Sequence, residues 1–143
     1  MRPKRNSSYG YVKALLLLGR VSNLPTVWSN CLAAWLLAGG ELVESADLQR
    51  FAWLISGATL LFLSGMFLND AFDVPFDRVH RPGRPIPSGA ISGKSVWVLG
   101  LAQLLLGLAC LVWMNTLAAL CAVGLAGSIL VYDWLHKRTA WSP

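Results

Sequence analysis

Four oxygen-bearing side chains fall within nine residues, directly after an uncharged apolar run over residues 51–68: Asn69, Asp70, Asp73 and Asp77. In a continuous helix, Asn69, Asp73 and Asp77 share one face, and Asp70 lies about 100° away. Because carboxylates at this spacing repel each other, they need a compensating charge, and Mg²⁺ prefers oxygen ligands of this kind. The spacing therefore predicts a Mg²⁺ site formed by these four residues. A charged cap that merely ends an apolar helix is the simpler alternative.

Pro75 lies inside this group of acidic residues. It has no amide hydrogen to bond to Ala71, so we expect a kink in the helix. The kink can rotate Asp77 relative to Asn69 and Asp73.

The segments on either side of these residues have the composition of membrane helices. Of the 143 residues, 55% are hydrophobic and only 13% are charged. Uncharged windows cover residues 21–40, 51–69 and 95–132, and a span needs about 20 residues. We predict an all-α, multi-pass transmembrane helix bundle with four spans, at about 22–39, 48–70, 92–113 and 117–134. Residues 1–20 are expected to form a basic cytoplasmic arm with a short interfacial helix, and residues 21–143 a membrane domain.

The net charge of +5 is distributed as a membrane topology requires. All but one of the 12 Lys and Arg residues lie before Val21, between Asp77 and Ser95, or after Tyr132. The exception, Arg50, shares its loop with acidic residues. The positive-inside rule then predicts an integral membrane protein with both termini and the 77–94 loop in the cytoplasm. The basic charge is attributed to topology and lipid headgroups, so nucleic acid is not an expected partner.

The segment from Arg78 to Gly93 is rich in Pro and Gly and has no apolar periodicity, which predicts a loop with fixed turns. Its arginines, Arg78, Arg81 and Arg84, can fork onto phosphate oxygens. They can equally serve as the basic residues of a cytoplasmic loop.

The pattern N-D-x-x-D-x-x-x-D, which begins at Asn69, resembles the first aspartate-rich motif of the UbiA-type intramembrane prenyltransferases. The later R-P-I-P-S-G, residues 84–89, is similar to the segment that follows that motif in many members. The segment after the fourth span is similar to the family's Tyr-x-x-x-Lys element. In this alignment Tyr132 matches the tyrosine of the element and His136 stands where the family has lysine. Lys137 follows one residue later.

This resemblance implies the first half of the UbiA fold and Mg²⁺-dependent transfer of a prenyl group from a prenyl diphosphate to an aromatic or other lipophilic acceptor. It implies catalytic roles for Asp73 and Asp77 and a Mg²⁺ site at Asn69, Asp70, Asp73 and Asp77. The diphosphate is expected to contact Arg78, Arg81, Arg84 and Lys137, and the substrate Asn23 and Tyr132.

Members of this family are longer and carry a second aspartate-rich motif, which residues 1–143 do not contain. We therefore expect a truncated form with little or no activity alone, with a C-terminal half or a second chain as a possible partner.

Two alternatives come from other classes of protein. A small non-enzymatic membrane protein could use the acidic site to carry ions or bind a partner, as intramembrane carboxylates often do. A phosphatidyl-alcohol transferase would also use a diphosphate substrate, but its usual Asp-Gly and Ala-Arg signature is not visible.

Overall fold

The computed structural model describes residues 10–114 and 116–135. These residues form helices and contain no β-strand, which confirms the all-α prediction. The elements, in order, are α1 (Tyr11–Leu18), the 3-10 turn η1 (Val21–Asn23), α2 (Leu24–Leu37), α3 (Ser45–Phe72), α4 (Val74–His80), α5 (Gly93–Met114) and α6 (Thr116–Leu135).

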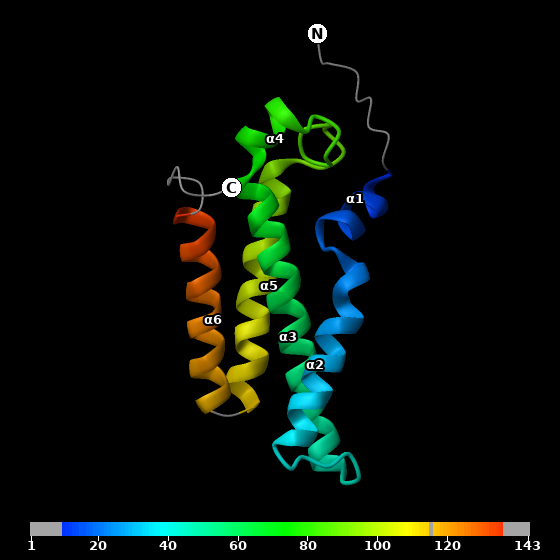
Figure 1. The fold of residues 1–143 in the computed structure, drawn as a ribbon, viewed down its shortest axis with the longest axis vertical. Helices are drawn as coiled ribbons and strands as arrows, with labels where there is room; N and C mark the ends of the chain where they lie inside the picture. The colour runs from blue at the N-terminus through cyan, green and yellow to red at the C-terminus, as the bar shows by residue number, and fades with distance from the viewer. Residues whose placement is uncertain (1–9, 115, 136–143) are drawn as a thin grey trace.

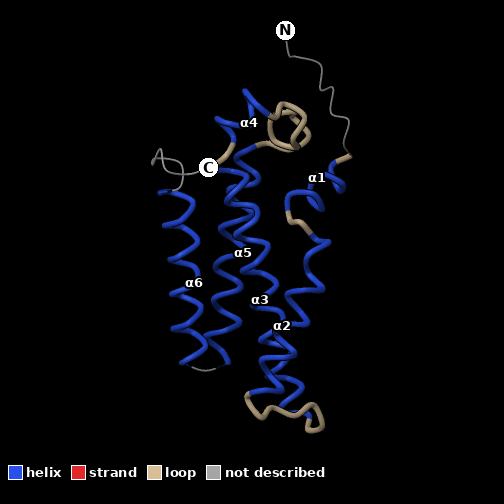
Figure 2. Tube along the Cα trace, in the orientation of Figure 1, coloured by secondary structure: helices blue, strands red, loops and turns tan. Residues whose placement is uncertain are grey.

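The long helices run side by side, and their connections gather at the two ends of the bundle. Helices α1 and α4 lie at one end, together with the loop that follows α4, whereas the α2–α3 connection lies at the other (Figure 1). Figure 2 shows the same division, with the loop segments drawn in tan at the ends and helix between them. The acidic motif, where α3 meets α4, therefore shares one end of the molecule with α1.

The contact between α3 and α5 forms the centre of the fold and is built on small residues. A Cβ atom added to Gly107 would lie 3.1 Å from the backbone oxygen of Gly57. One added to Gly100 would lie 2.9 Å from a side-chain carbon of Leu68. The buried Ser64 hydroxyl donates a hydrogen bond of 2.9 Å to the Gly100 carbonyl. Small residues thus let the two backbones approach closely, as is typical of membrane helix pairs.

Two of the four predicted spans are long and apolar enough to cross a membrane: α3, with 28 residues, and α5, with 22. Helix α2 has 14 residues, which at 1.5 Å each is about 21 Å, short of a hydrocarbon core of about 30 Å. Helix α6 has 20 residues, about 30 Å, and its part Thr116–Ile129 is found as a shorter apolar helix. The four-span prediction is therefore not confirmed beyond these two helices.

The kink predicted from Pro75 is present as a full break between two helices. Helix α3 ends at Phe72, α4 begins at Val74, and Asp73 lies between them. Because proline fits the first turn of a helix, Pro75 starts α4 rather than merely bending α3. The predicted loop from Arg78 is correspondingly wrong at its beginning, since α4 continues to His80.

Candidate active site at the end of the bundle

Arg84 joins two carboxylates of the acidic motif. Its Nη1 atom donates to Asp70 Oδ1 at 3.2 Å and to Asp77 Oδ2 at 3.0 Å. The Asp77 residue is only 2% exposed, and the Asp70 residue 8%. We call this arrangement the Arg84 bridge. It ties the loop after α4 to both α3 and α4, and the guanidinium neutralises carboxylates that would otherwise be buried at high cost.

The other two residues of the motif form a separate pair. Asn69 Nδ2 donates a hydrogen bond of 3.4 Å to Asp73 Oδ2. This leaves the Asn69 carbonyl oxygen and the Asp73 carboxylate close together at the break between α3 and α4. The single cluster of four predicted from a continuous helix is thus divided into two pairs. Seven residues are almost two helical turns, so Asp70 and Asp77 lie within about 20° of each other around the helix axis, on the side that faces Arg84.

The helical twist also separates the two pairs spatially. Asn69 and Asp70 are consecutive, so their side chains point about 100° apart. Asn69 lines an apolar cavity of about 700 Å³ between α2, α3 and α6. Asp70 lines a second cavity of about 440 Å³ beside α1. One turn of helix therefore presents a polar group to each of two cavities.

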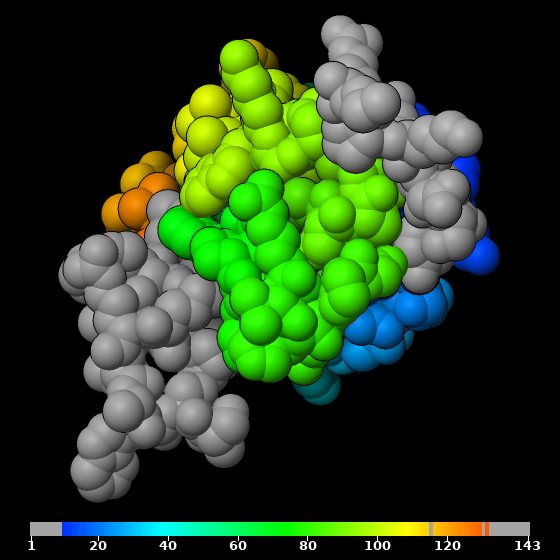
Figure 3. Space-filling view, turned by 90° about the horizontal axis from the view of Figure 1, so that it is seen from above, coloured from blue at the N-terminus to red at the C-terminus, as the bar shows by residue number. Residues whose placement is uncertain are grey.

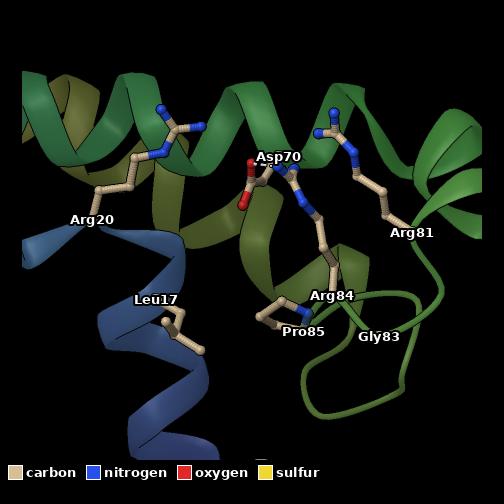
Figure 4. A pocket seen from close by; sticks show the side chains of 7 residues that line it. All are labelled: Leu17, Arg20, Asp70, Arg81, Gly83, Arg84 and Pro85. Carbon is tan, nitrogen blue, oxygen red and sulfur yellow. Dashed lines mark hydrogen bonds and ion pairs between the residues drawn. The ribbon is translucent and has the colours of Figure 1, made fainter.

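The second cavity, which we call the arginine pocket, is lined by Arg20, Arg81 and Arg84 together with Asp70, Leu17, Gly83 and Pro85. Figure 4 shows the arginine side chains directed toward the end of α3, with Asp70 between the heads of Arg20 and Arg84. Arg20 was missed as a site residue because its position after α1 reads as part of a basic arm. Its isolation between two apolar segments is the only sequence signal that could have distinguished it.

The loop that carries Arg81 and Arg84 is held by its own turns. Backbone amides of Ser88 and Ala90 donate to the carbonyls of Arg84 and Pro85 at 2.9 and 3.0 Å. Gly89 has φ of 77°, a conformation that glycine adopts without strain. Ile91, 2% exposed, packs in the core cluster that also contains residues of α1, α3 and α5. Figure 3 views this end and shows α4 and the loop as one continuous surface over the bundle.

The first cavity is mainly apolar. Arg20, Asn69 and Ser128 are its polar members, and its other lining residues, from α2, α3 and α6, are apolar. Arg20 thus lines both cavities. The site combines an apolar cavity with Asn69 in its wall, the Asp73 carboxylate that is hydrogen-bonded to Asn69, and a basic pocket next to them.

A comparison with known families decides what kind of protein has this site. The sequence model of the UbiA prenyltransferase family matches residues 15–143. The chain belongs to the UbiA prenyltransferase family. Similar relatives are each named digeranylgeranylglyceryl phosphate synthase. The relative from Pyrococcus horikoshii is 39% identical over 76% of this chain and 40% of its own length. The relative from Methanoregula boonei is 31% identical over 90% of this chain and 44% of its own length. The relative from Saccharolobus solfataricus is 26% identical over 91% of this chain and 45% of its own length.

The chain therefore spans less than half the length of these UbiA relatives. No solved structure matches it.

The remaining residues predicted from the UbiA resemblance are scattered. Arg78 is exposed on α4 and lines neither cavity, and Asn23 is exposed in η1 and likewise lines neither. Tyr132 falls within α6, but its side chain is not among those described. Lys137 and His136 lie outside the described residues. Their roles stay predictions.

The fit of Mg²⁺ can be judged from the donor atoms. No group of three or more His, Cys, Asp or Glu side chains is arranged to hold a metal ion within residues 10–114 and 116–135. Mg²⁺ is nevertheless commonly held by one or two protein ligands, with waters and substrate phosphates filling the other positions. The oxygens of Asn69 and Asp73 fit that mode. Asp77 Oδ1 is buried without a hydrogen-bond partner among the described residues, but the same carboxylate is held by Arg84.

Proposed function

We propose that the protein transfers a prenyl group from a prenyl diphosphate to a lipophilic acceptor. The observation that carries this proposal is the position of the Asn69–Asp73 pair. Asn69 lines an apolar cavity of about 700 Å³, so a ligand with a charged head and a hydrocarbon tail could place each part in a suitable environment. Membership of the UbiA prenyltransferase family supports the reaction class.

The named relatives support a more specific version. Their name describes a product with two geranylgeranyl groups on a glyceryl phosphate. We propose geranylgeranyl diphosphate as the donor, and as the acceptor a glyceryl phosphate that already carries one geranylgeranyl group. Because the chain covers less than half of these relatives, the activity of the whole enzyme is part of the proposal.

In this proposal Asn69 and Asp73 would hold Mg²⁺ by their side-chain oxygens. When bound, the ion neutralises negative charge that develops on the leaving diphosphate. Asp70 and Asp77, which the sequence grouped with the metal ligands, act instead through the Arg84 bridge. The apolar wall of the first cavity would surround the isoprenoid tail and exclude water from the allylic cation. The C–O bond to the diphosphate would break, the acceptor oxygen would form the new C–O bond, and the hydroxyl proton would leave with the diphosphate.

We further propose that the site faces the cytoplasm and that the protein is an integral membrane protein. The loop over residues 81–92 lies at the same end as α1, and the acidic α2–α3 connection lies at the other (Figure 1). This separation agrees with the distribution of basic residues that the positive-inside rule requires. Both termini would then be cytoplasmic, and α2 and α6 would complete a four-span arrangement within the family's full bundle.

Binding of a prenyl diphosphate to the purified chain in lipid nanodiscs tests the function. With Mg²⁺ present, Asp73→Asn is expected to weaken binding of geranylgeranyl diphosphate at least about tenfold, because a ligand of the ion loses its charge. Asp47→Asn, at the opposite end of α3, is the matched control and should bind as the unsubstituted chain does.

Equal binding by Asp73→Asn, or binding that is independent of Mg²⁺, would contradict the proposed site. Cation flux through vesicles in the absence of any prenyl diphosphate binding would favour the ion-carrying alternative.

A further inference from the structure

The lining of the apolar cavity follows α3 away from the acidic motif, from Asn69 to Ala58. These two residues are 11 positions apart, which is about 16 Å along a helix. Because α3 is continuous from Ser45 to Phe72, position along this helix measures depth below the Asn69–Asp73 pair. Among the described residues, no α3 residue nearer the N-terminus than Ala58 lines the cavity. Ala58 is therefore the deepest part of the α3 wall, and its side chain is a single methyl group.

Helix α2 is joined to α3 at the same depth. Val27 of α2 lines the cavity together with Ala58 of α3. The residues that follow them in sequence, Trp28 and Thr59, are bonded to each other, because Trp28 Nε1 donates to Thr59 Oγ1 at 3.0 Å. We call the level of Val27 and Ala58 the floor of the cavity. The cavity wall thus ends where a hydrogen bond holds α2 and α3 together.

Helix α6 lies close to α3 between the floor and Asn69. A Cβ atom added to Gly65 would lie 3.6 Å from a side-chain carbon of Ile129, and both residues line the cavity. Ser128 is the polar lining residue of α6, but its hydroxyl already donates to the Gly124 carbonyl at 2.8 Å. It therefore requires no polar partner from a ligand. The part of the cavity below Asn69 suits a hydrocarbon chain.

The size of the cavity can be compared with that of prenyl chains. An apolar cavity of about 150 Å³ binds benzene, or about 25 Å³ for each carbon, so the four five-carbon units of a geranylgeranyl tail need about 500 Å³. The cavity has about 700 Å³. An extended peptide covers about 1.2 Å for each backbone bond, so a geranylgeranyl tail extends about 19 Å and a geranyl tail about 9 Å. The longer tail reaches Ala58, about 16 Å from Asn69, and the shorter one does not.

We propose that Ala58 determines the longest prenyl chain that the cavity accepts. The inference rests on the proposed prenyl transfer, because the diphosphate must lie at the Asn69–Asp73 pair for the tail to extend along α3 to the floor. The last isoprene unit of a geranylgeranyl tail then lies against the Ala58 methyl group. A larger side chain at this position occupies the space of that unit, whereas a geranyl tail ends before it. The size of residue 58 thus selects the donor by its length.

The test compares two donors, geranylgeranyl diphosphate and geranyl diphosphate, on the full chain in nanodiscs with Mg²⁺. Each variant is described by the ratio of the two dissociation constants. Ala58→Phe is expected to weaken binding of the long donor tenfold or more and of the short donor less than threefold. Ala58→Leu, which fills less of the floor, should change the ratio threefold or more in the same direction. Ala52→Phe, the same substitution at an exposed α3 position outside the cavity, should leave the ratio unchanged.

The outcomes separate this inference from the proposed function. If Mg²⁺-dependent binding of both donors is found, but the ratio changes less than threefold in both Ala58 variants, the inference is overturned and the function stands. An equal loss for the two donors counts as this outcome, so a misfolded variant cannot pass for support. If the ratio changes as expected but binding is independent of Mg²⁺, the chain-length limit stands and the proposed metal site fails. If the unsubstituted chain binds neither donor, both are overturned.

Discussion

Removal of the Arg84 guanidinium should destabilise the whole end of the bundle that carries the site. In Arg84→Gln, Asp70 and Asp77 lose donors at 3.2 and 3.0 Å. The Asp77 side chain is 3% exposed and that of Asp70 11%, so water cannot readily replace the lost partner. The substitution keeps much of the side chain's length and its ability to donate a neutral hydrogen bond. The loss of stability in Arg84→Gln therefore measures mainly the contribution of the positive charge.

The magnitude follows from burial. Breaking a buried ion pair by removing one partner costs about 3–5 kcal/mol, whereas exposed pairs contribute about 0–1 kcal/mol. The Arg84 side chain is 28% exposed, so part of its interaction is screened by solvent. We therefore expect a loss near the lower limit, about 3 kcal/mol. At about 3 °C for each kcal/mol, the unfolding midpoint should fall by about 10 °C.

The assay is thermal unfolding in a mild detergent, followed by tryptophan fluorescence. Arg50→Gln is the control because Arg50 pairs with Asp47 at 3.4 Å while 65% exposed, and its loss should cost less than about 1 kcal/mol. Combining Arg84→Gln with Asp77→Asn should cost less than the sum of the two single effects, because the uncompensated carboxylate is then absent. A midpoint for Arg84→Gln equal to that of the Arg50→Gln control would refute the Arg84 bridge.

Two further predictions concern the α3–α5 contact and use the same unfolding assay. Gly107→Ala should destabilise by about 1–3 kcal/mol, since the new Cβ meets the Gly57 carbonyl at 3.1 Å and backbone cannot move aside. Gly124→Ala, where a Cβ meets nothing within 4 Å, should be neutral or stabilising by up to about 1 kcal/mol, and equal effects at both positions would contradict this close packing. Ser64→Ala should cost about 1 kcal/mol through the lost hydrogen bond to the Gly100 carbonyl, and an unchanged midpoint would show that the bond contributes nothing.

Much of the architecture could be predicted from local sequence. Apolar runs long enough to span a bilayer predicted α3 and α5, because a membrane segment must satisfy its own backbone hydrogen bonds. The short helix within residues 1–20 and the interruption of the helix near Pro75 followed from residues that act within one turn. The motif at Asn69 and its resemblance to the UbiA prenyltransferases pointed to the family that the comparison later showed.

The arrangement of the site was decided only by the tertiary structure. Spacing placed Asn69, Asp73 and Asp77 on one helix face, but it could not show that Asp77 pairs with Arg84, or that Asn69 and Asp70 face different cavities. It also gave no sign that Arg20, 50 residues before Asp70, lines both cavities. The physical reason is that helix formation and membrane burial depend on each residue's own neighbours in sequence. The pairing of charges depends on which of several arginines the folded backbone brings within about 3 Å, where the interaction becomes strong.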